Sequence, residues 1–203
     1  MNNDKSAQSF KGKHFLLIED DEVLIGKLKT IFQNIYLLEP VVKSYYNEAL
    51  TELKTNNHYD LIIFDIMLPM TNNDFSKIRG LKKELNNYID VIIRDEDESP
   101  NDPSFKFDLE QAREKRTAIA AEINKYIDQE GGIKLIEEWM KNIGLVASPP
   151  ILALTAIGPN EFIKTQERIN KVMSFKNVGI IQKPVTTEKL IKEINELIKN
   201  KNN

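Results

Sequence analysis

Acidic side chains follow two apolar runs of the sequence, at the point where each run ends. Glu19, Asp20 and Asp21 come directly after residues 14–18, and Asp65 closes a second run. Carboxylates gathered at one place repel one another and are stable only with a cation between them. Oxygen ligands without His or Cys favour Mg²⁺ or a similar hard ion, and a carboxylate can itself attack phosphorus. These acids are therefore candidates for metal-assisted phosphoryl transfer.

Two more polar groups end later apolar runs. Thr155 closes residues 150–155, and Lys183 lies near the end of residues 178–184. A hydroxyl and an ammonium group would stabilise the charge on the oxygens of a transferring phosphoryl group. Ala156 is small, so it leaves room for that group beside Thr155.

The elements that position these side chains alternate along the chain. Unbroken apolar runs predict buried strands at residues 14–18, 40–45, 59–65, 150–155 and 178–184. Apolar residues three or four apart predict helices at residues 22–37, 47–56, 133–143, 160–174 and 187–199. The alternation predicts an α/β fold, with a doubly wound, five-stranded parallel sheet. Because the carboxyl ends of its strands meet in one crevice, the polar groups above are expected to converge there.

Residues 71–130 interrupt this alternation. Apolar residues within 73–93 and 104–129 recur mostly at steps of three and four, which is typical of a heptad seam. Residues 94–103 are acidic and broken by prolines, so they predict a loop. The pattern indicates an antiparallel helical hairpin, with a short strand over residues 88–93 as the alternative.

The predicted domain organisation follows from this interruption. Residues 1–12 are a flexible tail, residues 13–70 and 131–200 form the sheet domain, and residues 71–130 form the inserted hairpin.

Composition excludes several classes of protein. The chain has 203 residues, a net charge of −3 and no cysteine, which argues against a general nucleic-acid binder and excludes thiolate catalysis and disulfides. No apolar run reaches the roughly 18 residues that span a bilayer, and the first 13 residues lack a hydrophobic signal core. We therefore expect a cytoplasmic protein that binds neither nucleic acid nor membrane.

Four stretches of the sequence together resemble the receiver domain of two-component response regulators. They are residues 16–22, 60–69, 151–156 and 182–184. The resemblance covers residues 13–70 and 131–200, and it implies a flavodoxin-like sheet with strand order 2-1-3-4-5.

The resemblance also implies a role for each acid. Asp65 would accept a phosphoryl group from a histidine kinase or a histidine phosphotransfer protein. Glu19 and Asp20 would hold Mg²⁺ together with Asp65 and the backbone carbonyl of Met67. The chain would be a phosphoacceptor with at most slow autodephosphorylation, not an enzyme acting on an external substrate.

The remaining site residues would sense the phosphoryl group. Thr155 would bind one of its oxygens, Lys183 would pair with it, and Pro184 would follow a cis bond. With Thr155, the switch region would include Ala156, Ile180 and Pro184. Receivers usually carry Tyr or Phe three residues before the lysine, and this aromatic ring forms half of their switch. Ile180 stands at that position here, so the aromatic half of the switch is absent.

No effector domain follows the last predicted helix, so we expect output through contact with an unknown downstream protein. The insertion could shield the site, dock a partner or pair two copies of the chain, and the fourth-helix face offers another dimer surface. One alternative function is a receiver-fold binding module that acts through residues 71–130 without regulated phosphorylation. Another is a Mg²⁺-dependent phosphohydrolase or nuclease, but such enzymes generally need an acid where Met67 stands.

Overall fold

The structure is a computed structural model that describes residues 12–56, 58–98, 103–143, 149–156, 159–172 and 177–201. The predicted tail lies outside these residues except for Gly12. Contacts group the chain into two compact units. The sheet domain runs up to Leu68 and resumes at Gln129, and the hairpin unit is Pro69–Asp128.

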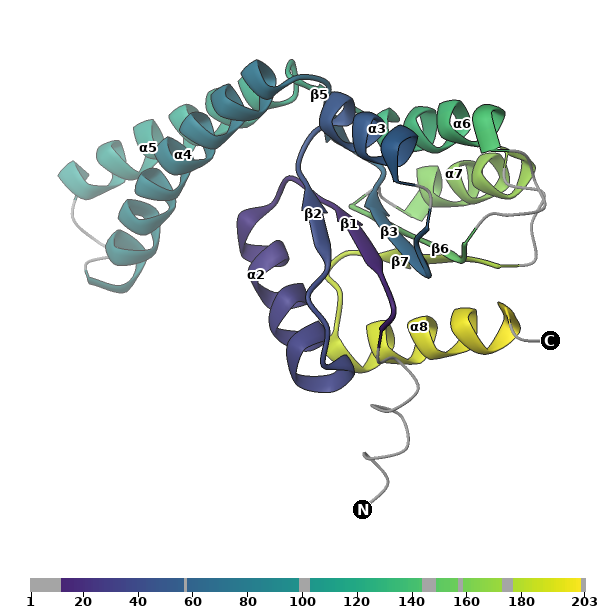
Figure 1. The fold of residues 1–203 in the computed structure, drawn as a ribbon. Coiled ribbons are helices and arrows are strands. Elements are labelled where there is room, and N and C mark those ends of the chain that lie inside the picture. Colours follow the sequence, from purple (N-terminus) through teal and green to yellow (C-terminus); the bar gives the residue numbers. More distant parts are fainter. Residues whose placement is uncertain are drawn as a thin grey trace. The chain divides into compact units, whose positions relative to one another are not determined.

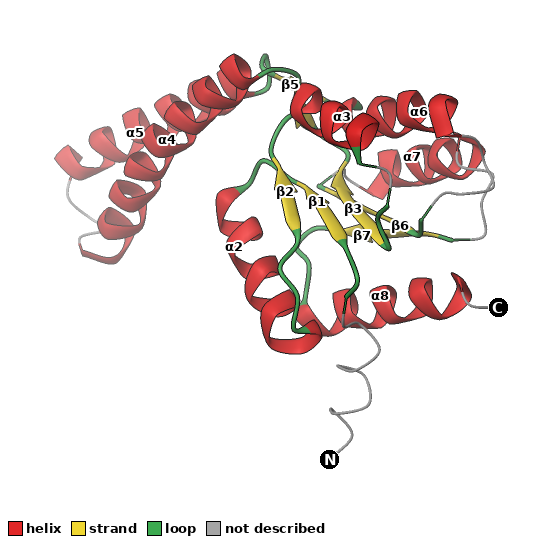
Figure 2. Cartoon of the chain, viewed as in Figure 1, coloured by secondary structure: helices red, strands yellow, loops and turns green. Residues whose placement is uncertain are grey.

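A five-stranded parallel sheet forms the centre of the sheet domain (Figures 1 and 2). Its strands are β1 (Phe15–Ile18), β2 (Val41–Lys43), β3 (Leu61–Asp65), β6 (Ile151–Thr155) and β7 (Val178–Gln182). They lie in the order β2-β1-β3-β6-β7, which is 2-1-3-4-5 when these five are counted along the chain. The predicted fold class and strand order are confirmed.

Helices cover both faces of this sheet. They are α2 (Glu22–Ile31), α3 (Tyr46–Thr55), α6 (Gly131–Ile143), α7 (Pro159–Val172) and α8 (Thr187–Lys201). Figure 1 shows α2 and α8 on one face and α3, α6 and α7 on the other. The first helix does not run regularly to residue 37, as predicted. It widens into a π-helical turn, Phe32–Tyr36, and stops at Leu37, which has a left-handed φ of 53°.

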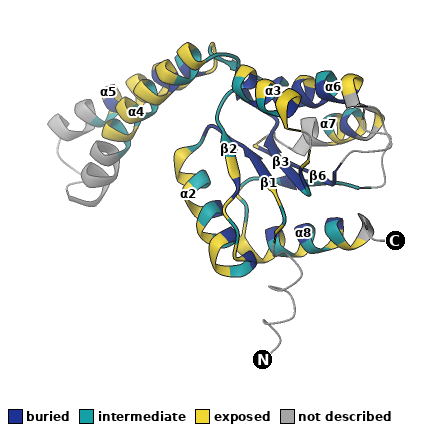
Figure 3. Cartoon of the chain, viewed as in Figure 1, coloured by how far each residue is buried: buried dark blue, intermediate teal, exposed yellow. Residues whose placement is uncertain are grey.

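The three inner strands, β1, β3 and β6, are buried along their length because both of their faces are apolar, whereas the edge strands β2 and β7 are largely half-buried (Figure 3). Phe15 and Leu17 of β1 point to the face covered by α2 and α8, where they pack with Leu28 and Leu190. Leu16, Ile18, Ile62 and Phe64 alternate with residues of that cluster, so they face the other helix layer, and all four are fully buried. Burial of each such side chain stabilises the fold by about 1.5–3 kcal/mol relative to its exposure.

The hairpin unit consists of α4 (Asn72–Glu98) and α5 (Pro103–Ile123). Thr71 caps α4, since its Oγ1 accepts a hydrogen bond from the Asp74 N–H (3.2 Å) while the Asp74 carboxylate accepts one from the Thr71 N–H (3.2 Å). Pro103 occupies the first position of α5, where a helix needs no N–H donor. Before and after the helices, β4 (Leu68–Pro69) pairs with β5 (Ile127–Asp128).

Two predictions for the hairpin are wrong in detail. The predicted loop at residues 94–103 is helical up to Glu98, because charged residues are tolerated in a helix and the first breaking residue is Pro100. Residues 99–102 lie outside the described part of the chain. Residues 88–93 form helix, as the hairpin prediction has it, so the alternative of a short strand there is wrong. Helix α5 ends at Ile123 and not at residue 129, because residues 127–128 pair with β4.

Candidate functional site

Three of the predicted acids meet at the carboxyl edge of the sheet. Glu19 and Asp20 follow β1, and Asp65 ends the neighbouring β3. One carboxylate oxygen from each lies within 4.8 Å of the others, and all three residues are buried. Asp21 does a different job, because its Oδ1 accepts hydrogen bonds from the N–H groups of Val23 (2.9 Å) and Leu24 (3.1 Å) and so caps α2.

Lys183 joins two of these acids. Its Nζ lies 2.8 Å from Asp65 Oδ2 and 2.9 Å from Glu19 Oε2. The loop after β7 delivers this side chain, and the Lys183 N–H donates to the Thr155 carbonyl (2.6 Å). The Lys183–Pro184 peptide bond is cis, as predicted.

The electrostatics of the site favour a further cation. Burial raises the pKa of Glu19 to about 8, and the neighbouring Asp65 carboxylate acts in the same direction. Burial also raises the pKa of Asp65, although Lys183 opposes this. Burial alone would lower the pKa of Lys183, but the carboxylates of Glu19 and Asp65 outweigh it and raise that pKa.

The donor set indicates which kind of cation fits. If all three carboxylates were ionised, they and one ammonium group would carry a formal charge of −2, which one divalent ion would neutralise. All three candidate ligands are carboxylates, and oxygen ligands suit hard ions. The cluster of Glu19, Asp20 and Asp65 could therefore hold a metal ion.

Backbone groups fix the position of Asp65. The Met67 N–H donates to Asp65 Oδ1 (3.2 Å), which leaves Oδ2 to Lys183. Gly132, at the start of α6, donates its N–H to the Ile66 carbonyl (2.9 Å). A Cβ at Gly132 would overlap the Asp65 carbonyl oxygen, so only glycine lets α6 begin this close to β3. Sequence reasoning assigned Gly132 no part in the site, and the glycine pair before a predicted helix was the available signal.

The other predicted residues lie on β6, on β7 and just beyond them. Thr155 is fully buried and directly follows Leu154, the residue that pairs with Asp65 across the sheet. Ala156 is exposed, and so is Pro184. Ile180 is half-buried on β7, where it pairs with Ala153.

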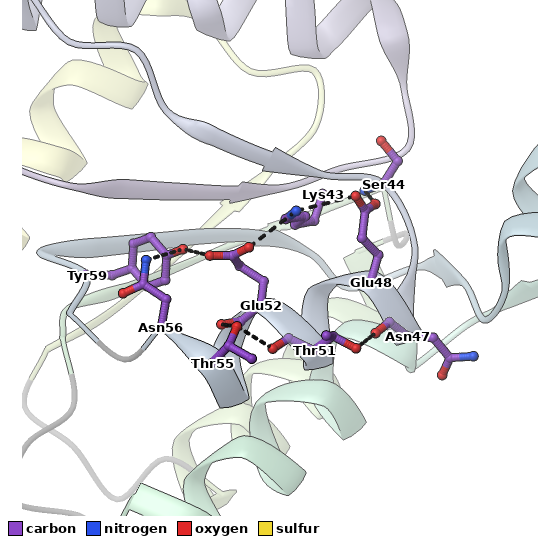
Figure 4. Close-up of polar contacts among 9 residues, drawn as sticks. All are labelled: Lys43, Ser44, Asn47, Glu48, Thr51, Glu52, Thr55, Asn56 and Tyr59. Atoms are coloured by element: carbon purple, nitrogen blue, oxygen red, sulfur yellow. Dashed lines mark hydrogen bonds and ion pairs between the residues drawn. The ribbon is translucent and has the colours of Figure 1, made fainter.

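A second group of charged residues lies between β2 and α3 (Figure 4). Lys43 forms ion pairs with Glu48 (3.4 Å) and Glu52 (3.3 Å). Glu52 also accepts a hydrogen bond from the Tyr59 hydroxyl (2.5 Å), which in turn accepts one from Asn56 (3.2 Å). These groups satisfy one another, so the cluster ties α3 to the sheet and does not extend the acidic site.

Comparison with family models and with curated protein sequences gave no match. Among solved structures, the chain is similar to a two-component response regulator from Clostridium difficile, with a TM-score of 0.52 and 16% identity over 94% of this chain and 99% of the other. It is also similar to a response regulator receiver domain protein from Clostridium thermocellum, with a TM-score of 0.50 and 16% identity over 94% and 97% of the two chains. The chain has the receiver-domain fold.

A CheY-like receiver domain protein from Methanospirillum hungatei JF-1 gives the same result, with a TM-score of 0.50 and 16% identity over 93% of this chain and 94% of the other. The predicted resemblance to receiver domains is thus confirmed at the level of the fold. In the part of the chain that the structure describes, no helix is both long and apolar enough to cross a bilayer.

Proposed function

We propose that this chain is a response regulator receiver that accepts a phosphoryl group on Asp65. The observation that carries the proposal is the contact of Lys183 with both Asp65 (2.8 Å) and Glu19 (2.9 Å) inside a buried acidic cluster. A half-buried lysine between two buried acids holds one carboxylate oriented and supplies positive charge where phosphoryl oxygens would arrive. A purely structural ion pair would not need Asp20 as a third carboxylate beside it.

The reaction is a transfer from phosphohistidine to a carboxylate. An oxygen of Asp65 attacks phosphorus, and the P–N bond breaks with its electron pair passing to the imidazole. The imidazole leaves as a neutral group when its other nitrogen carries a proton. Asp65 is the nucleophile of this step, as in covalent catalysis, and it becomes an acyl phosphate.

Each neighbouring group of this chain has a part in that step. The Met67 N–H holds one oxygen of Asp65, so the carboxylate keeps its orientation. Lys183 exchanges its contact with Asp65 for one with the incoming phosphoryl oxygens, and the Thr155 hydroxyl donates to another of them. Glu19, Asp20 and Asp65, with the Met67 carbonyl, would hold Mg²⁺. When bound, Mg²⁺ would neutralise charge on the transferring oxygens.

The direct test uses a small phosphodonor. The protein is incubated with acetyl phosphate or phosphoramidate and Mg²⁺, and its intact mass is measured. We expect a gain of one phosphoryl group, lost on omission of Mg²⁺ and absent in Asp65→Asn. An unmodified wild-type protein, or the same gain in Asp65→Asn, would refute the assignment.

The proposed partners follow from the chemistry. The donor is a histidine kinase or a histidine phosphotransfer protein, and the output is an altered affinity for a downstream protein. Phosphorylation would bias an existing equilibrium of the region around Thr155, Ala156, Ile180 and Pro184.

Ile180 favours a second candidate function. Its aliphatic side chain is half-buried on β7 and carries no aromatic ring that could swing with Thr155. A receiver fold kept as a binding module would act through the hairpin unit instead. In that case deletion of residues 72–129 abolishes partner binding, and Asp65→Ala leaves it intact. The phosphoacceptor function instead predicts that Asp65→Ala abolishes the regulation of that binding.

A further inference from the structure

The hairpin unit buries its apolar side chains incompletely. In its core, Ile78, Ile119 and Ile123 are buried, and other apolar residues pack against them while remaining partly exposed. From residue 79 to residue 89, three turns of α4, no side chain is fully buried. That stretch includes Leu81, Leu85, Tyr88 and Ile89. A single partner helix therefore leaves an apolar stripe of α4 half open.

The opposing helix contributes to this opening. On α5, every residue from Arg113 to Ala118 is exposed, although the preceding Ala112 and the following Ile119 are buried. Arg116 occupies the heptad position between them, where an apolar residue would close the seam. Lys115 lies over the ring of Tyr88, with its Nζ 5.5 Å from the ring centre. The α4 stripe thus faces charged side chains of its partner rather than a continuous apolar seam.

A second copy of the same stripe could cover it. The half-buried stripe runs from Leu81 to Ile89, so it is centred on Leu85. If two α4 helices lay antiparallel about a two-fold axis at Leu85, each Leu81 would be opposite the Ile89 of the other copy. Such an interface uses the same patch twice, as most homodimers do.

The charge of α4 selects the same arrangement. Residues 72–89 carry four basic and two acidic side chains, a net charge of +2, while residues 90–98 carry one basic and five acidic side chains, a net charge of −4. With the axis at Leu85, the acidic residues 90–98 of one copy lie opposite residues 72–80 of the other, which carry two basic and one acidic side chain. Parallel helices would instead place the acidic parts of the two copies together. Complementary charge of this kind fixes register and orientation.

We propose that the hairpin unit is a self-association surface, in which α4 pairs antiparallel with α4 of a second copy of this chain. Each dimer would form a four-helix arrangement from two hairpins and would cover the Leu81–Ile89 stripe. The inference is independent of the proposed phosphorylation of Asp65.

The test is a pair of complementary charge variants of the full chain. One is Arg79→Glu with Lys82→Glu, and the other is Asp90→Lys, because position 90 lies opposite position 80 of the other copy in this register. In a two-fold antiparallel dimer, each variant alone brings like charges together in both of its contacts. A mixture of the two variants restores opposite charges in both contacts of the heterodimer.

Molar mass by light scattering and sedimentation velocity gives the readout. We expect a wild-type dimer that salt weakens, a dissociation constant raised about tenfold or more in each variant, and a mixed dimer close to wild type. A matched control is Lys189→Glu with Lys192→Glu on α8, which has the same charge change and spacing on exposed residues and should dimerise like wild type. Asp65→Asn should also dimerise normally, which separates this result from the phosphorylation test.

Three outcomes would overturn the proposal. They are a wild-type chain that remains monomeric at about 1 mM, a dimer that neither variant weakens, and a mixture that does not associate better than its components. Circular dichroism of each variant establishes that its helices are intact.

Discussion

The ammonium nitrogen of Lys183 lies 2.8 Å from Asp65 Oδ2, although the two residues are 118 positions apart in the chain. The contact joins the loop after β7 to the end of β3, two strands that are not neighbours in the sheet. Only β6 lies between them, and the Thr155 carbonyl at its end accepts a hydrogen bond from the Lys183 N–H (2.6 Å). Removal of the ammonium group should therefore affect both the stability and the chemistry of the site.

Replacement of Lys183 with Met should lower the free energy of unfolding by about 3 kcal/mol without metal, because it leaves buried acids without their cation. Mg²⁺ should stabilise this variant more than wild type, since its uncompensated charge is larger. Urea unfolding with and without Mg²⁺ measures both effects. Lys189→Met, at an exposed position of α8, is the control and should change little. An unchanged stability of Lys183→Met would contradict the role of the ion pair.

Mg²⁺ should raise the melting temperature of the wild-type protein. When Mg²⁺ binds only the folded state, a free Mg²⁺ concentration ten times the dissociation constant raises the free energy of unfolding by about 1.4 kcal/mol. The double variant Glu19→Gln with Asp20→Asn should lose the effect, because only Asp65 of the three carboxylates remains. Differential scanning calorimetry at constant ionic strength is the measurement. An equal shift in the double variant would place metal binding elsewhere.

Two glycine substitutions should have effects of opposite sign. Gly132→Ala places a Cβ on the Asp65 carbonyl oxygen and should destabilise the sheet domain by about 1–3 kcal/mol. Gly80→Ala on α4 meets no atom within 4 Å and should stabilise the helix by up to about 1 kcal/mol. Urea unfolding followed by circular dichroism compares them. A neutral Gly132→Ala would mean that α6 can move away from β3 at little cost.

The Glu52 cluster predicts a pH dependence of stability. The hydrogen bond from Tyr59, followed by contacts with Lys43, holds the pKa of Glu52 below its ordinary value of 4.5. The ionised Glu52 therefore contributes to the free energy of unfolding. This contribution is fully present above pH 4.5 and is lost as the pH falls through the pKa of Glu52 in the folded state. Glu52→Gln should lower the free energy of unfolding by about 1 kcal/mol at neutral pH, and this difference should shrink in acid.

Thermal unfolding across the acid range measures this difference. Tyr59→Phe keeps the ring but removes the hydroxyl donor, so it should remove most of the same pH-dependent stability. A difference between wild type and Glu52→Gln that stays constant down to the lowest pH would show that the charge of Glu52 is not responsible.

Features with a strong local pattern could be predicted from the sequence. The strands β1 and β3 were predictable because both of their faces are apolar, and the acids at their ends follow from parallel register. The sequence groups Asp21 with the site acids, because a carboxylate after a strand can serve either as a ligand or as the cap of the next helix. Only the hydrogen bonds to Val23 and Leu24 assign it to the helix.

Other features depend on contacts that no local pattern encodes. A strand as short as Leu68–Pro69 has no periodicity, so its pairing with Ile127–Asp128 could not be foreseen, and neither could the early end of α5. The close approach of Gly132 to Asp65 depends on how α6 packs, which glycine permits but does not specify. The extent of α4 was underestimated because its last residues are charged, and a charged sequence is compatible with both loop and helix.

The pairing of β4 with β5 makes the insertion begin and end at one point of the sheet domain. A chain cut between α4 and α5 would therefore leave β1, β2 and β3 on one fragment and β6 and β7 on the other, each ending in one helix of the hairpin. Because α4 and α5 pack on each other in the hairpin, those two helices would hold the two fragments together. The insertion would therefore allow the sheet domain to be reassembled from two separate fragments.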